Sequence, residues 1–332
     1  MKLSDFDYNL PKELIAQFPL KKRHKARMLV VDRKTTVIQH SIFEQIINYL
    51  QPSDVVVIND SKVLNCRLVG RRVTGGIVEV FLLRRIKEDS NQAYFQALIH
   101  PARVKIGERI TFSKNISCIR TGQKEVLFNT KQIKRIYSIG QVPLPPYIRR
   151  APTFLDKCYY QTVYAKKEGS VAAPTAGLHF SQNLLKDIRK KVNIVSITLH
   201  IGLGTFKPVK TEDITQHQMD SEYYEIPQQT LDILNQVRQR KGRIFAVGTT
   251  SCRCLESFAN SGQREGWTDL FIYPGYRFKM TDCLLTNFHL PKTTLFMLVC
   301  AFCSTELAKK AYQEAIKEKY RFYSYGDAML IL

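Results

Sequence analysis

The sequence predicts an α/β main domain with a mixed β-sheet, into which a small all-β, barrel-like domain is inserted. Three observations predict this fold class. Apolar strand-like runs alternate with helical patterns near the start of the chain, and the same alternation resumes in its second half. Between these parts, short alternating apolar runs follow one another, separated by turn signals such as "TGG" and "TGQ". We therefore predict a discontinuous α/β catalytic domain, residues 1–65 and 138–332, and an inserted barrel-like domain, residues 66–137.

The first 65 residues carry signals for two helices, a hairpin and a buried strand. Pro11 stands in the first turn of the first predicted helix, where a missing N–H is tolerated. Ser41 and Glu44 have the spacing of a capping box at the start of the second. In order, we expect a helix over 10–17, a hairpin of strands over 27–33 and 36–40, a helix over 41–50 and a buried strand over 54–60.

Helices and strands alternate again after the inserted domain. The three prolines of "GQVPLPPYIRR", residues 140–150, predict a stiff, extended return linker. Ser181 and one of Thr293 or Thr294 are candidate helix caps. We expect helices over 156–166, 182–191, 230–241, 251–259, 293–303 and 306–322, strands over 193–202, 243–248, 270–275 and 283–288, and a last segment over 325–332 that packs back on the domain.

The charge of the chain favours a polyanionic partner. Its 50 Lys and Arg residues against 29 Asp and Glu give a formal net charge of +21, spread over several short clusters. Such an excess attracts nucleic acid, and dispersed clusters suit a folded RNA better than a single groove. The alternative is a set of solvated basic surfaces.

Other features of the sequence argue against secretion, membrane insertion and metal binding. The first residues are polar and charged, so we expect no secretory signal, and the apolar run 293–303 is shorter than the ~20 residues that span a bilayer. We therefore expect a soluble, cytoplasmic chain. Cys300 and Cys303 have CxxC spacing but no second pair faces them, so we expect buried free thiols and assign no metal.

The stretch "GSVAAPTAGLHF", residues 169–180, is small and uncharged in a basic, bulky chain. Small residues let the backbone approach a ligand or another strand closely. One interpretation is a crowded core turn with His179 as a buried core histidine. The other is a ligand cradle that includes Thr175 and Gly177, with His179 at its rim.

The segment "RIFAVGTTSCRCLES" reads as a strand, a turn and a helix. The first N–H groups of a helix are unpaired and positively polarised, so they favour a carboxylate or a phosphate. Thr249, Thr250 and Ser251 would add hydroxyls there and Arg253 a charge. The alternative is an ordinary helix N-cap.

Three further segments place polar groups at predicted strand ends. In "TLHIGLGTFKPV", His200 is followed by Gly202 and Gly204, but the dinucleotide pattern is not met. "HQMDSEYYEI" gathers acids, among them Glu222, that suit ribose hydroxyls or proton transfer. His200 is equally compatible with the core, and the acidic segment with an exposed strand edge. The remaining candidates are Asp60 in "VVVINDSKV" and His289 in "TNFHLPKTTLFML".

Taken together, these stretches resemble one family across residues 3–331. The resemblance rests on "NDSKV", "PLPPYI", "YQTVYAKKEGSVAAPTAGLHF", "HIGLGTFKPV", "AVGTTSCRCLES", "LLTNFHLPKTTLFML" and "YRFYSYGDAML". The family is the S-adenosylmethionine:tRNA ribosyltransferase-isomerases of queuosine synthesis. It implies transfer and isomerisation of the ribosyl group of S-adenosylmethionine onto a 7-aminomethyl-7-deazaguanine at the tRNA wobble position, with release of adenine and methionine. The family fold, an α/β domain with an inserted β-barrel, is similar to our prediction.

The resemblance also suggests roles for the candidate residues. S-adenosylmethionine would be the only co-substrate, with no metal, and the partner would be the anticodon stem-loop of a tRNA bound by a monomer. The predicted proton carriers are His179, His200, Glu222, His289 and Asp60. The predicted ligand-binding residues are Thr175, Gly177, Gly202, Gly204, Thr249, Thr250, Ser251 and Arg253, with Tyr164 or Tyr276 stacking on a base.

One departure from the family pattern leaves rival functions open. Asp220 stands in "HQMDSE", where a histidine is common. A non-catalytic tRNA-binding protein would retain affinity without releasing adenine. An RNA methyltransferase would form S-adenosylhomocysteine, although the missing glycine fingerprint argues against it.

Overall fold

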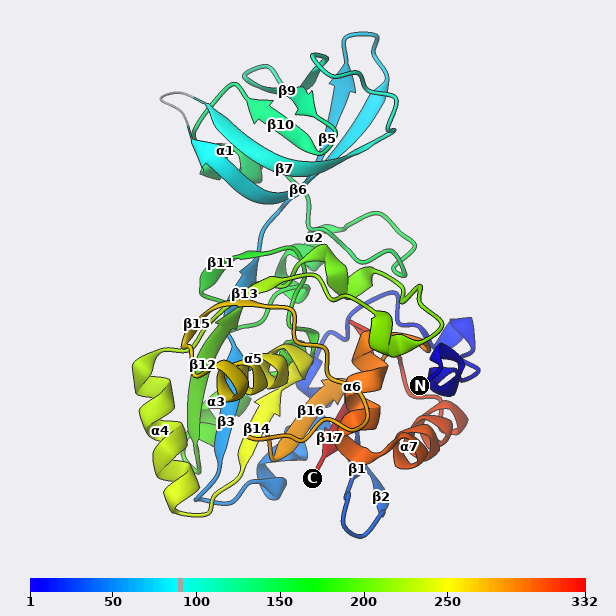
Figure 1. Ribbon diagram of the computed structural model, residues 1–332, viewed down its shortest axis with the longest axis vertical. Coiled ribbons are helices and arrows are strands. Elements are labelled where there is room, and N and C mark those ends of the chain that lie inside the picture. The colour runs from blue at the N-terminus through cyan, green and yellow to red at the C-terminus, as the bar shows by residue number, and fades with distance from the viewer. Residues whose placement is uncertain (89–91) are drawn as a thin grey trace.

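A nine-stranded mixed sheet and a closed six-stranded barrel form the two parts of the molecule (Figure 1). The computed structural model describes residues 1–88 and 92–332 of the chain. The predicted fold class, an α/β domain with an inserted all-β barrel, is confirmed.

Four parallel strands form the centre of the sheet. β12 and β14 flank β3 in parallel, and β16 continues the parallel set beside β14. β17 is antiparallel to β16 but parallel to β1, so Met28 of β1 lies opposite Ala328 of β17. The order across the sheet is β15 (Glu265–Thr268), β13 (Glu222–Glu225), β12 (Asn193–Leu199), β3 (Val55–Asn59), β14 (Ile244–Val247), β16 (Cys283–Asn287), β17 (Ala328–Ile331), β1 (Arg27–Val31) and β2 (Ile38–Ile42).

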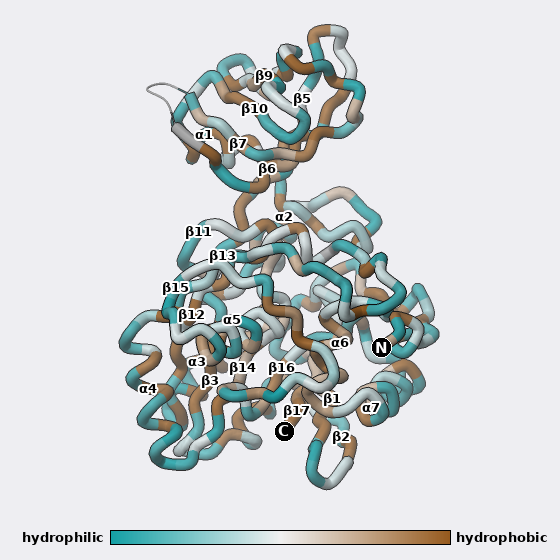
Figure 2. The backbone as a smooth tube through the Cα atoms, in the orientation of Figure 1, coloured by the Kyte–Doolittle hydropathy of each residue, from teal (hydrophilic) through white to brown (hydrophobic). Residues whose placement is uncertain are grey.

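Both faces of this sheet are covered. Successive strand residues point to opposite faces, so Leu29 and Val31 pack into one hydrophobic cluster and Met28 and Val30 into another. The first cluster lies under α4 (Gln228–Gln239), α5 (Gly248–Ser261), α6 (Thr294–Cys303) and α7 (Thr305–Lys317); the second lies under α3 (Gln182–Arg189) and 3₁₀ helices over Phe43–Tyr49 and Thr175–His179. Hydrophobic and hydrophilic residues alternate along α4, as expected for a helix with one buried face (Figure 2).

The ends of two central strands are joined by one side chain. The Asn59 amide nitrogen donates to the carbonyl of Leu199 at 3.0 Å, and its oxygen accepts from the Leu199 N–H at 3.1 Å. The same oxygen accepts from the N–H of Ser61. Asn59 therefore aligns the carboxyl ends of β3 and β12 and turns the chain away from the sheet.

The inserted part is a closed barrel with an apolar interior. Its strands, in chain order, are β5 (Arg67–Arg72), β6 (Ile77–Glu88), β7 (Ala93–His100), β8 (Arg109–Ser113), β9 (Ile116–Gly122) and β10 (Glu125–Phe128). Buried residues such as Leu68, Val80 and Phe95 alternate with exposed ones, as the sequence pattern predicts. α1 (Ile133–Ser138) packs against the barrel through Ile136, and the closed ring of described strands has no free sheet edge.

The chain enters and leaves the barrel through one narrow neck (Figure 1). Arg67 and Gln141 exchange two backbone hydrogen bonds there, of 3.3 and 2.7 Å. Gly140 lies so close to the incoming chain that an added Cβ would fall 1.8 Å from the backbone oxygen of Asn65. Below the neck, β4 (Ser61–Val63) and β11 (Lys167–Ser170) form a short parallel pair.

Two helices predicted near the start of the chain are replaced by 3₁₀ turns. Over 10–17 only Lys12–Leu14 is helical, because the next backbone groups bond to Phe322 instead. The helix expected over 41–50 is a 3₁₀ helix with Ile42 at its N-cap. The capping box is absent there, since the Ser41 hydroxyl donates to Gln45.

Three predictions in the second half also need correction. The helix over 156–166 is shorter and earlier, α2 (Phe154–Tyr159), because Thr153 and Asp156 form its capping box. Residues 270–275 form no strand; the Leu270 carbonyl instead accepts from Arg253. α7 ends at Lys317 rather than 322. The hairpin, the strands over 54–60 and 283–288, and the Ser181 and Thr293 caps are confirmed.

The contact at Gly140 predicts a large effect of one methyl group. Gly140→Ala forces the two chain crossings of the neck apart, and we expect the free energy of unfolding to fall by about 2 kcal/mol or more. Urea unfolding measures the change. Gly76→Ala, whose Cβ would have only ordinary contacts beyond 3.4 Å, is the matched control and should stay within about 0.5 kcal/mol of the unsubstituted chain. Equal losses in the two variants would contradict this account of the neck.

Candidate functional site

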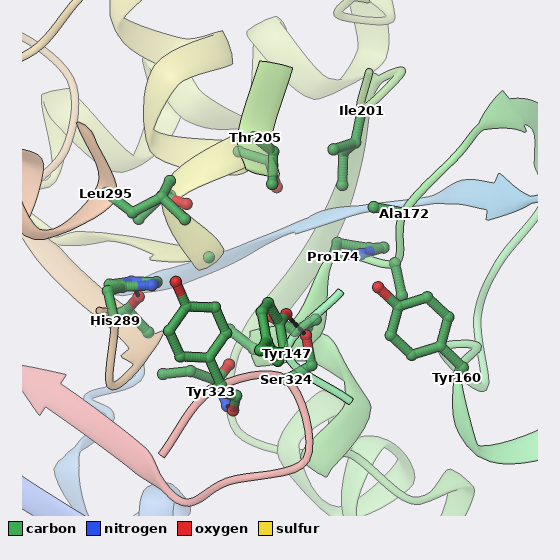
Figure 3. Close-up of a pocket in the computed structure, with 18 residues that line it drawn as sticks. Tyr147, Tyr160, Ala172, Pro174, Ile201, Thr205, His289, Leu295, Tyr323 and Ser324 are labelled. Carbon is green, nitrogen blue, oxygen red and sulfur yellow. Dashed lines mark hydrogen bonds between the residues drawn. The ribbon is translucent and has the colours of Figure 1, made fainter. Parts of the chain in front are cut away.

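A partly open cavity, here called the inner pocket, lies at the carboxyl ends of the parallel strands. This is where ligands bind in open α/β sheets. Its empty volume, including its mouth, is about 590 Å³. The lining comes from the segments after β11, β12, β14 and β16 and from the turn before β17 (Figure 3). Tyr147 and Tyr160 are added from the chain between α1 and β11. The lining residues are Tyr147, Tyr160, Ala172, Ala173, Pro174, Thr175, Ala176, Ile201, Thr205, Gly248, Thr249, Thr250, Thr286, Asn287, His289, Leu295, Tyr323 and Ser324.

One wall of the inner pocket is made of small residues. Residues 172–176, "AAPTA", pass close to the start of α5, where Gly248 has a φ of +86°. This left-handed backbone turns the chain directly from β14 into the helix, and glycine adopts it without strain. The first turn of α5 is thereby exposed to the pocket through Thr249 and Thr250. The cradle interpretation of this stretch accounts for its composition, since bulkier side chains would fill the cavity.

Three polar atoms around the inner pocket lack partners. The Tyr160 hydroxyl, Thr250 Oγ1 and Asn287 Oδ1 are buried and accept or donate no hydrogen bond within the described residues. Buried polar groups are normally satisfied, and each unpaired one costs about 1–3 kcal/mol. Their convergence on one cavity indicates a polar ligand.

His289 supplies the imidazole of the inner pocket. Its Nε2 lies 2.8 Å from the Thr286 hydroxyl, and its backbone N–H donates to Tyr312. Burial lowers the pKa of His289 to about 3, so the ring is neutral at pH 7. A neutral imidazole can accept a proton or hydrogen-bond a ligand there.

Aromatic rings form the rest of the wall (Figure 3). The rings of Tyr147 and Tyr323 are 3.8 Å apart at 62°, and the hydroxyl of Tyr147 is hydrogen-bonded to Ser324. Tyr323 has a φ of +73°, which turns the chain into β17. No Asp, Glu, Lys or Arg lines the inner pocket as described. Such a neutral, aromatic cavity suits a heterocycle or a sulfonium cation, which aromatic faces attract.

The structure brings four of the predicted residues into this pocket: Thr175, Thr249, Thr250 and His289. Ser251 is fully buried, and its hydroxyl donates to the Val247 carbonyl within the helix instead. The hydroxyl of Ser251 therefore does not face the inner pocket, and a ligand-binding role for Ser251 stays a prediction.

His179 lies behind the inner pocket rather than at its rim. Its ring packs 4.9 Å from that of Phe43, and its Nε2 lies 3.2 Å from the Asn287 amide nitrogen. Burial lowers the pKa of His179 to about 3. His179 is not among the residues that line the inner pocket, and its ring contacts the side chain of Asn287, so its role as a proton carrier stays a prediction.

Asp60 and Gly177 also lie outside the lining. The Asp60 carboxylate accepts from the Thr198 hydroxyl at 2.7 Å. At Gly177 an added Cβ would fall 2.0 Å from the hydroxyl of Tyr164, so the glycine serves side-chain packing. Tyr276, the other predicted stacking residue, is bonded to Asn260 and to Glu256.

The guanidinium of Arg253 donates its hydrogen bonds to groups of the protein itself. It donates to the Glu222 carboxylate and to the carbonyls of Leu270, Asp220 and Thr268. Glu222 also accepts from the Gly202 N–H at 2.7 Å. Both members of the pair are buried and hydrogen-bonded within the protein, so the predicted binding of a ligand carboxylate by Arg253 finds no support in this arrangement and stays a prediction.

His200, Gly202 and Glu222 line a second, open cavity, here called the outer groove. It lies between the barrel and the edge of the sheet and has an empty volume of about 1290 Å³ including its open side. Gly204 lies against Asp220, which also lines the groove and is paired with Lys207. Ile201 lines both cavities.

Sequence reasoning missed Tyr147, Thr286, Asn287, Tyr323 and Ser324. Thr286 and Asn287 lie near the end of a predicted strand, just before Phe288 and His289, and this position was a usable signal. The other three come from irregular segments far apart in the chain, which pattern alone does not bring together.

The described residues give no sign of a metal centre or a membrane span. Within 1–88 and 92–332, no three His, Cys, Asp or Glu side chains gather where they could hold an ion. Cys300 and Cys303 are free and buried, as expected. No helix in the same ranges is long and apolar enough to cross a membrane.

Comparison with known proteins gives consistent results. A model of the family described as queuosine biosynthesis protein matches residues 3–331. An S-adenosylmethionine:tRNA ribosyltransferase-isomerase from Sulfurihydrogenibium sp. is 51% identical to this chain over 340 residues. One from Desulforamulus reducens is 49% identical over 347 residues. Both alignments cover 100% of this chain and 100% of the relative. The crystal structure of an S-adenosylmethionine tRNA ribosyltransferase from Thermotoga maritima is similar with a TM-score of 0.58 and 35% identity, covering 99% of this chain and 100% of that chain.

The two buried histidines predict acid sensitivity. Their pKa values of about 3 lie below the ordinary value of about 6.5, so each binds a proton on unfolding between these pH values. The free energy of unfolding should therefore fall by about 2 kcal/mol per histidine between pH 7 and pH 5. Urea unfolding at both pH values measures the difference. His289→Gln should remove about half of it, whereas the exposed His100→Gln should not. An unchanged pH dependence in His289→Gln would contradict the assignment.

Proposed function

The chain belongs to the queuosine biosynthesis family and is an S-adenosylmethionine:tRNA ribosyltransferase-isomerase, and we propose that its inner pocket binds S-adenosylmethionine. The enzyme transfers and isomerises the ribosyl group onto the 7-aminomethyl-7-deazaguanine of the tRNA, giving epoxyqueuosine and releasing adenine and methionine. The observation that carries the assignment of the pocket is the convergence of three unpaired, buried polar atoms on a neutral cavity at the strand ends.

The lining of the inner pocket supports binding of each part of this substrate. Aromatic rings suit both the adenine and the sulfonium, and the small-residue wall leaves room for the ribose. At the start of α5, the N–H groups of the first turn and the hydroxyls of Thr249 and Thr250 suit the methionine carboxylate. Arg253 has no part in this binding, because it is bonded to Glu222.

We assign the proton transfers to His289 and its hydroxyl neighbours. The sulfonium acidifies the adjacent 5′ carbon of the ribose, so a neutral base placed beside it can remove a proton. His289 is neutral because burial lowers its pKa to about 3. Tyr323 and Thr286, which line the same cavity, are positioned to hydrogen-bond the sugar oxygens or the departing base. His179 is proposed to act only through Asn287.

The position of Asp220 supports an active enzyme over a non-catalytic relative. Asp220 lies in the outer groove and pairs with Lys207, so its replacement of a more common histidine leaves the inner pocket unaltered. Methyl transfer has no comparable support, because no glycine-rich nucleotide motif opens any of the helices beside the pocket.

We further propose the finer features expected from the sequence. The RNA partner is the anticodon stem-loop, and the excess of 21 positive charges supports binding of its phosphates. The chain would act in the cytoplasm as a monomer and without a metal. The catalytic α/β domain would comprise residues 1–65 and 138–332 and the inserted domain residues 66–137.

Product analysis tests the function. With S-adenosylmethionine and tRNA that carries the aminomethyl deazaguanine, we expect adenine and methionine in equal amounts, measured by liquid chromatography. The same tRNA with an unmodified guanine should release neither. Formation of S-adenosylhomocysteine would instead indicate methyl transfer, and tight tRNA binding without any product would indicate a non-catalytic relative.

A pair of neighbouring variants tests the inner pocket. Thr250→Val removes the unpaired hydroxyl without changing the side-chain shape, so affinity for S-adenosylmethionine should fall about 3- to 12-fold. The free energy of unfolding should stay the same or rise, since no protein partner is lost. Isothermal titration calorimetry and urea unfolding measure the two quantities. Ser251→Ala is the control: its hydroxyl faces the helix, so it should leave this affinity unchanged. Loss of affinity for S-adenosylmethionine in Ser251→Ala but not in Thr250→Val would contradict this assignment of the inner pocket.

A further inference from the structure

Three aromatic side chains form a row across the edge of the sheet, in the outer groove. The ring of His200, just beyond the end of β12, stacks on Tyr223 with the centroids 6.1 Å apart and the planes at 20°. Tyr223 of β13 pairs directly with Trp267 of β15, and their rings are 5.8 Å apart. The backbone N–H of His200 donates to the Tyr223 carbonyl. The three rings therefore occupy neighbouring positions on one face of the sheet, and we call them the aromatic row.

Trp267, at one end of the aromatic row, is exposed to solvent, and His200, at the other end, is held against the backbone of Gly169. Trp267 is 60% exposed, although it is the only tryptophan of the chain. His200 lies flat against Gly169, where an added Cβ would be 2.6 Å from the imidazole. Gly169 has a φ of +152°, which also favours glycine. An exposed tryptophan on an edge strand is unusual, because edge strands normally carry charged residues that prevent association.

The barrel supplies unpaired positive charge to the same groove. Arg84 of β6 and Lys124 both line it and are exposed, and neither has an ion-pair partner in the described parts of the chain. By contrast, the acids of the groove are neutralised, Asp220 by Lys207 and Glu222 by Arg253. The groove thus presents aromatic faces on the sheet side and free cations on the barrel side.

We propose that the outer groove binds one unpaired nucleotide of an RNA loop, whose base stacks on the aromatic row while its phosphates contact Arg84 and Lys124. Aromatic rings on a sheet face are a common platform for unstacked RNA bases, and cations beside them hold the backbone. A protein partner fits less well, because the cations are free and the groove lacks unpaired acids. This inference rests on the proposed function, which supplies a tRNA loop as the substrate.

The groove also explains how the acceptor reaches the chemistry. Ile201 lines both cavities, so the two are separated by little more than the turn after β12. A nucleotide held on the aromatic row lies beside this opening. S-adenosylmethionine in the inner pocket and RNA in the outer groove would then approach each other from opposite sides of Ile201.

The single tryptophan provides a direct test. The probe is an anticodon stem-loop RNA with an unmodified guanine at the wobble position, titrated while Trp267 emission is recorded. Stacking should quench the emission with the same Kd as filter binding, whereas a fully paired RNA of equal length should not quench it. S-adenosylmethionine alone should leave the emission unchanged. RNA binding without quenching, or quenching by S-adenosylmethionine alone, would overturn the proposal.

Substitutions separate the stacking from the charge. Trp267→Ala should weaken stem-loop binding about 5- to 100-fold, and Trp267→Phe should restore most of it. The double variant Arg84→Ala/Lys124→Ala should reduce the magnitude of the negative slope of log K against log salt concentration by about 1.4. This is the change expected for two lost contacts to single-stranded RNA. Lys310→Ala, an exposed cation of α7, is the control and should change neither Kd nor the stacking signal.

The outcomes also separate this inference from the proposed function. The inference alone would be overturned if the groove variants bind RNA with a Kd within twofold of that of the unsubstituted chain and still release adenine. Variants that lose S-adenosylmethionine binding to the same extent as RNA binding would also overturn it, because the groove would then belong to the first substrate. A chain that neither binds tRNA nor releases adenine would overturn both.

Discussion

The two hydrogen bonds between the side chain of Asn59 and the backbone of Leu199 determine where the active edge of the sheet lies. They align the ends of β3 and β12 and replace the backbone pairing that would otherwise continue beyond them. Beyond this point β3 and β12 no longer pair with each other, and the space above the strand ends stays open. The start of α5 and the residues that end β16 enclose this space from the other side. The inner pocket is therefore a consequence of strands that stop together.

Much of this arrangement was predictable because it depends on local pattern. Strand periodicity and turn residues predict the sheet and the barrel, and the rule that polar groups after parallel strands converge predicts Thr249, Thr250 and His289. The candidates whose side chains do not line the inner pocket have a common explanation. The partners of His179 and Arg253, namely Phe43, Asn287 and Glu222, lie far away in the sequence, and no local pattern shows whether a side chain faces a cavity or such a partner.

The buried pair of Arg253 and Glu222 joins elements that border the two cavities. It connects α5, which opens on the inner pocket, to β13 and to the Gly202 turn beside the outer groove. Burial raises the pKa of Glu222, while the adjacent guanidinium opposes this shift. Removal of one partner from such a pair typically costs 3–5 kcal/mol, because the other charge remains buried alone. An arginine in an otherwise attractive anion site can thus be structural, and its hydrogen-bond count reveals this.

The parallel pairing of β1 with β17 has a consequence for synthesis of the chain. Arg27 and Asp327, which are hydrogen-bonded at this junction, are 300 positions apart. At about 5–20 residues per second, a ribosome needs about 15–60 s to make that length. During this time the hairpin β1–β2 lacks its neighbour, and a two-stranded hairpin alone is marginally stable. Four of the five residues of β1 are buried in the finished sheet, so the nascent chain must keep an apolar strand edge away from other chains until residue 328 has been translated.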